Sequence, residues 1–177
     1  ECAAEVGALA DAVRAIGVPV FLAGMARGLL GAVTTQQVRH HRKDALREAD
    51  VVLLCGVPMD FRVDYGRHIG AQATIVSVNR DRAELNKNRR STMAVCADAD
   101  LFVRALAGAG ARTSCGAWQA RLAERDAGRD AEIAAQSGMA LSPLNTLAVC
   151  RAVDDALTDN STIVADGGDF VGTASYV

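Results

Sequence analysis

The stretch 48–62, EADVVLLCGVPMDFR, contains an apolar run over 51–55 that ends at a glycine. The run is long enough for a strand, and it lacks the polar alternation of a strand with one face in water. An unbroken run is typical of a parallel strand that helices cover on both faces. Charged residues follow closely, with Asp60 and Arg62 just beyond the glycine. The stretch therefore predicts a buried strand with an acid and a base near its carboxyl end.

Outward from this stretch, short apolar runs alternate with helix-like segments over the first 110 residues. This alternation indicates βαβ units and a parallel sheet. The predicted fold class is α/β, a Rossmann-like doubly wound parallel sheet. Asp98 is placed to cap the last helix of this part. Strands are expected at 18–22, 51–55, 73–78 and 92–96, and helices at 1–16, 36–49 and 98–110.

The pattern changes beyond residue 111. The polar, alanine-rich residues 111–138 predict a surface helix that serves as a connector. A new helix begins near Ser142, a candidate cap, with Pro143 in its first turn. A strand is expected at 161–165, followed by another helix start. Since the chain opens on a helix, we expect most of one domain, lacking its first strand, plus the first βα piece of a second α/β domain.

The composition excludes several classes of function. A net charge of −2 over 177 residues gives no general attraction to nucleic acid or anionic membranes. No apolar run approaches the ~20 residues of a membrane helix, and an anchor outside these residues stays open. The five cysteines include no CxxC pair, which argues against a disulfide framework or a zinc site. They favour a reducing compartment and hence an intracellular, cytoplasmic protein, in which Cys55 and Cys96 are expected to be buried thiols.

Three further sequence features give little evidence for a functional site. The glycine-rich GMARGLLG at 24–31 does not match the dinucleotide fingerprint G-x-G-x-x-G. The pair His40–His41 is interpreted as a solvated helix face, since neighbouring helical positions diverge. The stretch 79–90 holds five basic and two acidic residues but no aromatic one, which disfavours nucleic-acid binding.

Polar residues follow three of the predicted strands. Asp60 and Arg62 follow one strand, Asn79 and Arg80 the next, and Asp98 a third. Ligands of open parallel sheets bind beyond the carboxyl ends of the strands. Carboxylate and amide groups suit ribose hydroxyls, and arginine suits phosphate. The residues leave two interpretations open: a nucleotide crevice, or ordinary polar loops with a local ion pair between Asp60 and Arg62.

Four stretches, in this order and spacing, resemble the thiamine-diphosphate enzyme superfamily, in particular the acetolactate synthase-like proteins, also called 2-hydroxyacyl-CoA lyases. They are GMARGLLG, ALREADVVLLCGVPMDFRV, IVSVNRDRAELNKN and LTDNSTIVADGGDFVGTA. The resemblance implies a central nucleotide-binding-like domain at 1–112, a helical linker at 113–141, and the amino-terminal part of the thiamine-diphosphate-binding domain at 142–177.

The resemblance also implies a lyase or transferase that uses thiamine diphosphate and Mg²⁺ to make or break carbon–carbon bonds next to a carbonyl. The substrates of such an enzyme would be 2-oxo acids or 2-hydroxyacyl-CoA. The enzyme would form a homodimer or a homotetramer. The family's activating glutamate and GDG…N magnesium motif are not among these residues. We therefore expect the chain alone to be inactive and to hold no catalytic or metal-binding residue. The alternative is a non-catalytic Rossmann-type module for nucleotide binding or subunit assembly.

Two sets of residues match cofactor-contacting positions of the family. Gly168, Asp169 and Phe170 match the segment that lies against the diphosphate of thiamine diphosphate. Asp169 replaces an uncharged residue, so backbone contact is expected there; the pattern DGGDF also suits an acidic helix cap. The residues that match the central domain's nucleotide positions are Gly56, Asp60, Arg62, Asn79, Arg80, Ala97 and Asp98.

Departures from the synthase pattern bear on the nucleotide. Pro58 stands where the synthases have an arginine, and Asn79 replaces an acid. Arg42 matches the first arginine of a segment typical of the lyases. These differences favour ADP, or an empty site, over FAD.

Overall fold

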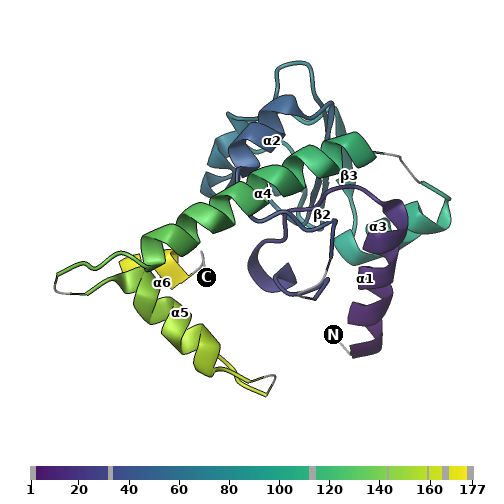
Figure 1. Ribbon diagram of the computed structural model, residues 1–177. Coiled ribbons are helices and arrows are strands. Elements are labelled where there is room, and N and C mark those ends of the chain that lie inside the picture. The colour runs from purple at the N-terminus through teal and green to yellow at the C-terminus, as the bar shows by residue number, and fades with distance from the viewer. Residues whose placement is uncertain are drawn as a thin grey trace. The chain divides into compact units, whose positions relative to one another are not determined.

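A computed structural model describes residues 3–31, 34–111, 115–142, 144–158, 160–164 and 168–174. The chain divides into two compact units, Glu1–Glu124 and Arg125–Val177. The helices and strands are α1 (Ala3–Ile16), α2 (Arg42–Glu48), β1 (Val51–Cys55), β2 (Thr74–Asn79), β3 (Met93–Cys96), α3 (Ala99–Gly108), α4 (Gly116–Ser137), α5 (Thr146–Ala156) and α6 (Asp169–Ala174) (Figure 1).

A parallel sheet of three strands, in the order β1-β2-β3, forms the centre of the first unit. The register places Cys55 of β1 opposite Val78 of β2, and Asn79 of β2 opposite Cys96 of β3. The carboxyl ends of the three strands therefore lie along one edge of the sheet. The α/β class and these three strands are confirmed.

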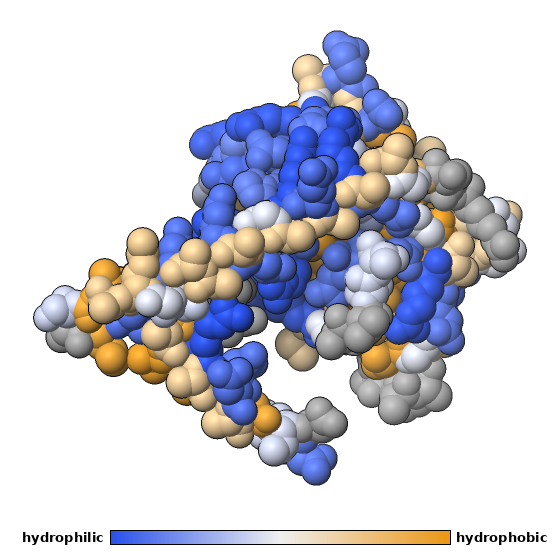
Figure 2. All heavy atoms as spheres, in the orientation of Figure 1, coloured by the Kyte–Doolittle hydropathy of each residue, from blue (hydrophilic) through white to orange (hydrophobic). Residues whose placement is uncertain are grey.

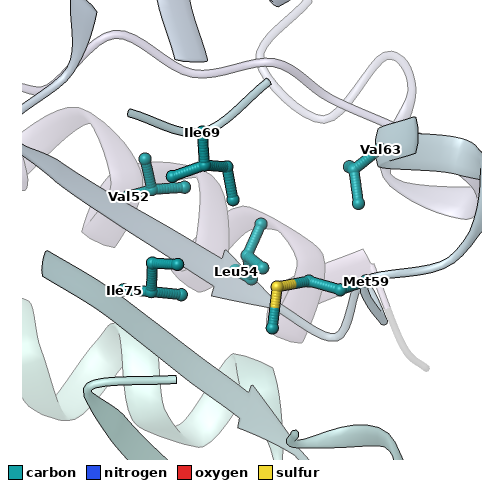
Figure 3. Close-up of a cluster of buried hydrophobic side chains, with 6 residues drawn as sticks. All are labelled: Val52, Leu54, Met59, Val63, Ile69 and Ile75. Atoms are coloured by element: carbon teal, nitrogen blue, oxygen red, sulfur yellow. The ribbon is translucent and has the colours of Figure 1, made fainter. Parts of the chain in front are cut away.

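One face of the sheet carries a hydrophobic cluster. Alternate residues of β1 and β2 point into it, and the segment that follows β1 covers them (Figure 3). Because successive side chains of a strand point to opposite faces, only every second residue can contribute. The cluster consists of Val52, Leu54, Met59, Val63, Ile69 and Ile75.

The opposite face is covered at one end only. Helices α1 and α3 lie side by side (Figure 1) and pack through Ile16 and Val103, and this cluster reaches the sheet at Cys55. Toward the other end, Val51 is 61% exposed and Met93 56% exposed. The prediction of a strand buried on both faces is thus correct only at its carboxyl end.

The segment before α2 differs from the prediction. Residues 18–22 form no strand, because Val20 alone makes a parallel bridge, to Gln37. The Val20 N–H donates to the Gln36 oxygen at 2.8 Å, and the Val38 N–H donates to the Val20 oxygen at 2.9 Å. This pairing occupies the backbone that a helix would need. The helix predicted at 36–49 therefore begins only at Arg42.

The amino-terminal part of α4 packs on α2. Leu122 of α4 contacts Ala45 of α2 and Val38 in a third buried cluster. The surface around α2 is mostly hydrophilic, whereas a stripe of weakly hydrophobic residues follows α4 (Figure 2). The helix predicted at 111–138 is confirmed over Gly116–Ser137, and its role as a connector stays a prediction. Over the ranges that the structure describes, no helix combines the length and the apolar character needed to cross a bilayer.

The second unit differs from prediction at two points. Helix α5 is capped by Asn145 rather than by Ser142. Residues 161–164 form no strand, and Ile163 and Val164 are exposed. Residue 165 lies outside the described part of the chain, as does Pro143. The strand predicted at 161–165 is therefore wrong over its first four residues, which have no neighbouring strand to pair with among the described residues of this unit.

Candidate functional site

An open cleft of about 260 Å³ lies at the carboxyl edge of the sheet. Its residues come from the ends of all three strands, because β1, β2 and β3 are parallel and end along the same edge. Four of the five lining residues were predicted from the sequence; Ala99 was not. The cleft is lined by Gly56, Asn79, Arg80, Asp98 and Ala99.

Gly56 turns the chain at the end of β1. Its φ of +71° lies in the left-handed region that favours glycine. Its N–H donates to the Val78 oxygen at 2.8 Å, which continues the sheet ladder one residue beyond the strand. A Cβ at this position would lie 3.5 Å from the Ala99 Cβ, an ordinary contact. The backbone conformation, rather than lack of space, therefore explains the glycine.

Asp98 is the acidic group of the cleft. Its Oδ1 accepts a hydrogen bond from the Leu101 N–H at 3.0 Å and so caps α3, as the sequence predicted. Its Oδ2 forms an ion pair with Arg80. The hydrogen bond from Leu101, and next the Arg80 guanidinium, hold the pKa of the Asp98 carboxyl below its usual value. The cleft therefore contains an ionised carboxylate at neutral pH.

Arg80 supplies the positive charge. Its side chain is 79% exposed although it is paired with Asp98. An exposed guanidinium retains donors that can meet a phosphate oxygen. Beside it, the Asn79 Oδ1 accepts from the Asp81 N–H at 3.0 Å, and the Asn79 backbone oxygen accepts from the Ala97 N–H at 3.1 Å. Ala97 thus supports the cleft through its backbone and does not line it.

Asp60 and Arg62 lie on the segment 57–70, here called the 57–70 loop, and not among the cleft-lining residues. The Asp60 carboxylate accepts from the Arg62 N–H at 2.9 Å and from its Nη1 at 2.5 Å. The local ion pair of the second interpretation is therefore present. Arg42 Nη2, at the start of α2, donates to the Arg62 oxygen at 2.6 Å. That contact joins the start of α2 to this loop.

The residues predicted to meet thiamine diphosphate belong to the second unit. Gly168 has a φ of +111°, and α6 begins at Asp169. The side chains of Asp169 and Phe170 lie outside the described part of the structure. Their contact with a diphosphate stays a prediction.

The remaining histidines and cysteines show two differences from prediction. His40 is buried, at 9% exposure, and both His40 and His41 precede α2, so they form no solvated helix face. Cys96 is exposed rather than buried. Burial raises the pKa of the Cys55 thiol to about 11. Within the described ranges, no three His, Cys, Asp or Glu side chains come together as a metal site.

Comparison with known proteins shows the family to which the chain belongs. A family model described as "Thiamine pyrophosphate enzyme, central domain" matches residues 2–106. The chain therefore belongs to the thiamine pyrophosphate enzymes and contains a fragment of their central domain, which confirms the resemblance seen in the sequence.

Relatives of this chain fall into two groups by name. The chain is 41% identical to a 2-hydroxyacyl-CoA lyase 2 of Danio rerio over 94% of its length, and 39% identical to the Homo sapiens protein of that name over 96%. It is 32% identical to a probable acetolactate synthase of Mycobacterium bovis over 86% of its length. Each match covers 28% of the relative, so the chain spans less than a third of these proteins.

Proposed function

We propose that the chain is a segment of a thiamine-diphosphate-dependent enzyme that makes or breaks a carbon–carbon bond next to a carbonyl. The match to the central domain of this family carries the proposal. The sequence of the chain is 41% identical to that of a protein named as a 2-hydroxyacyl-CoA lyase and 32% identical to that of one named as an acetolactate synthase. This difference favours 2-hydroxyacyl-CoA over 2-oxo acids as the substrate class. A homodimer or homotetramer and the boundaries 1–112, 113–141 and 142–177 belong to the same proposal.

When bound, thiamine diphosphate would supply the carbanion that attacks the carbonyl. The part this chain would play is limited to backbone N–H groups near Gly168, Asp169 and Phe170, where the chain turns into α6. Backbone amides at such a turn suit phosphate oxygens. Because the family's GDG…N magnesium motif is not among these residues, Mg²⁺ is proposed to bind outside them.

The cleft and the neighbouring 57–70 loop are proposed to hold the adenosine diphosphate portion of a nucleotide. Asn79 and Asp98 would accept or donate hydrogen bonds to the ribose hydroxyls. The exposed guanidinium groups of Arg80 and Arg62 would meet the diphosphate. Pro58, in place of the synthases' arginine, favours ADP over FAD.

Calorimetry of the full-length protein with ADP and with FAD tests the nucleotide site. We expect ADP to bind, and Arg62→Ala to weaken its binding roughly tenfold through loss of a charged hydrogen bond. Arg90→Ala removes the same charge from an exposed position in the next loop and serves as the matched control. Equal affinities for wild type and Arg62→Ala would remove Arg62 from the site.

A turnover assay separates the enzyme from the alternative, a non-catalytic module for nucleotide binding or subunit assembly. The full-length protein is supplied with thiamine diphosphate, Mg²⁺ and either 2-hydroxyacyl-CoA or 2-oxo acid. Cleavage of the acyl-CoA is the expected result. ADP binding without turnover of either substrate class would instead support the module.

A further inference from the structure

The basic stretch after β2 holds the 57–70 loop through side-chain contacts. Arg89 is partly buried, and its guanidinium reaches backbone oxygens about 20 residues earlier in the chain. Hydrogen bonds from a charged donor are stronger than neutral ones and fix the position of their acceptors. Arg89 Nη1 donates to the Gly66 oxygen at 2.9 Å and to the Ile69 oxygen at 2.6 Å, and Nη2 donates to the Gly70 oxygen at 2.9 Å.

Asn88 holds the other end of the same loop. Its φ of +62° is unusual for a residue with a side chain, and Asn tolerates this conformation better than most. Its Nδ2 donates to the Met59 oxygen at 2.7 Å, one residue before Asp60. Two adjacent side chains, Asn88 and Arg89, therefore bind both ends of the loop.

The 57–70 loop has a conformation that needs such support. Asp64 and Tyr65 follow one another with φ of +48° and +56°. Left-handed residues with side chains cost about 1 kcal/mol or more each. A third left-handed residue, Gly66, packs against Arg89, since a Cβ on it would lie 3.3 Å from the Arg89 Cδ. Arg89 thus contacts the strained turn through both hydrogen bonds and packing.

Lys87 lies near acidic residues of both the 57–70 loop and the segment that leads out of the cleft. The pKa of Lys87 is raised, first by its hydrogen bond to Glu84 and further by the charges of Asp60 and Asp81. Asp60 belongs to the loop, whereas Asp81 directly follows the cleft residues Asn79 and Arg80. Lys87 therefore lies within electrostatic range of an acidic residue on each side.

We propose that Asn88 and Arg89 are positioning residues that join the two halves of the nucleotide site, so that the 57–70 loop presents Asp60 and Arg62 to a nucleotide in the cleft. This positioning role rests on the proposed nucleotide function. It also accounts for Arg89, one of the five basic residues of 79–90, without a nucleic-acid partner, since its guanidinium is directed at the protein's own carbonyl oxygens.

A double-mutant cycle on the full-length protein tests this coupling, with ADP as the probe in calorimetry. Arg89→Ala alone should weaken ADP binding about tenfold, since Arg62 is no longer held in place. Arg62→Ala should then cost only about twofold more in the Arg89→Ala background, because residues that act through one another are not additive. Additive losses overturn the proposal.

Two further variants distinguish a positioning role of Arg89 from an effect of its charge alone. Arg90→Ala removes a neighbouring exposed charge and should leave ADP affinity within about twofold. Arg89→Lys keeps the charge but cannot reproduce the guanidinium's three fixed hydrogen bonds. Full affinity in Arg89→Lys would assign the effect to charge alone and overturn the positioning role.

If neither ADP nor FAD binds, the proposed nucleotide function is rejected. Hydrogen exchange tests even then whether Asn88 and Arg89 hold the 57–70 loop in position. The amides of Val63 and Tyr65 both donate to the Asp60 oxygen, at 3.1 and 2.8 Å. They should exchange at least about tenfold faster in Arg89→Ala than in Arg90→Ala. If Arg89→Ala does not fold, Asn88→Asp, which turns a donor into an acceptor facing the Met59 oxygen, takes its place. Unchanged exchange rates overturn the positioning role.

Discussion

Gly66 is the residue at which backbone conformation and packing act together. Its φ of +75° lies in the left-handed region, and a Cβ would lie 3.2 Å from the Met59 Sδ and 3.3 Å from the Arg89 Cδ. A side chain here therefore faces both backbone strain and crowding. The position is sensitive because the loop that follows β1 covers the hydrophobic cluster of Figure 3.

Gly66→Ala should lower the free energy of unfolding by about 1 to 3 kcal/mol. Gly128→Ala provides the opposite control, since Gly128 lies inside α4 and a Cβ added to it would meet no atom within 4 Å. An alanine there should stabilise the helix by about 0.5 to 1 kcal/mol. Urea denaturation measures both values, and a stabilising Gly66→Ala would contradict the strain described for this loop.

Asp98 gives a prediction on pH. Its pKa is lower in the folded protein than the usual value, so it stabilises the fold at pH values above about 4, the unfolded pKa of an aspartate. That contribution is lost as the pH falls through the lower folded pKa. In Asp98→Asn the amide oxygen still caps α3, but the part of the acid-induced loss of stability that comes from Asp98 should disappear. Unfolding curves at pH 7 and between pH 4 and 2 measure this difference, with the exposed Asp11→Asn as control.

At the residue scale, the roles that could be predicted from the sequence are those that depend on neighbouring residues in the chain. The capping role of Asp98 follows from its position just before an amphipathic run, and the structure confirms it. The contacts of Asn88 and Arg89 with the 57–70 loop were not predicted. They join side chains to backbone oxygens 19 to 29 residues away, and such a contact leaves no periodicity or motif in the sequence.

At the element scale, Asn145 shows why a helix start was predicted three residues too early. Ser142 and Asn145 are both suitable caps, and the sequence alone does not rank them. Asn145 is 7% exposed and serves two helices at once. Its Oδ1 accepts from the Leu147 N–H at 3.1 Å, while its Nδ2 donates to the oxygens of Gln136 at 2.7 Å and Met139 at 2.8 Å.

Asn145→Asp should therefore destabilise the pair α4 and α5. The carboxylate keeps the capping acceptor but loses the donor to two backbone carbonyl oxygens, which costs about 1 to 3 kcal/mol. Circular dichroism at the helical bands during thermal unfolding measures the change. Gln136→Ala, an exposed position at the end of α4, serves as control. Equal melting curves for Asn145→Asp and wild type would show that the donor contacts contribute nothing.

Two predicted strands fail for a common reason. A strand exists through hydrogen bonds to a neighbour, whereas apolar composition only permits it. Val20 finds a single partner in Gln37, and 161–164 pairs with no strand among the described residues. By contrast, β1, β2 and β3 form backbone hydrogen bonds with their neighbours in the sheet. The same kind of apolar run therefore gave correct predictions there.

At the scale of the whole molecule, the length of the chain relative to its relatives leads to a prediction on catalytic activity. The chain spans 28% of the lyases and synthases that it matches. The 177-residue chain, supplied with thiamine diphosphate and Mg²⁺, should show no turnover of 2-hydroxyacyl-CoA, whereas the full-length protein should. A steady-state assay of both proteins at equal concentration decides this. Turnover by the 177-residue chain alone would show that its own residues include a complete active site.

The convergence of the three strand ends was the part of the site that the sequence predicted best. Parallel strands in register must end at one edge, so polar residues after each strand meet there. The division of the predicted residues between a cleft and an adjoining loop was not predicted. It depends on how far the chain turns after Gly56, and a loop conformation of this kind is set by tertiary contacts.

The exposed thiol of Cys96 stands two residues before Asp98, and its Sγ donates to the Arg80 oxygen at 3.5 Å. Cys150 is buried, and the pKa of Cys55, about 11, keeps that thiol protonated at neutral pH. Since alkylating reagents attack accessible thiolates, Cys96 is open to labelling under conditions that leave these two intact. In a variant whose Cys2 and Cys115 are replaced by serine, a fluorophore attached to Cys96 would sit beside the cleft residue Asn79, its partner in the sheet, and would report on the occupancy of the cleft.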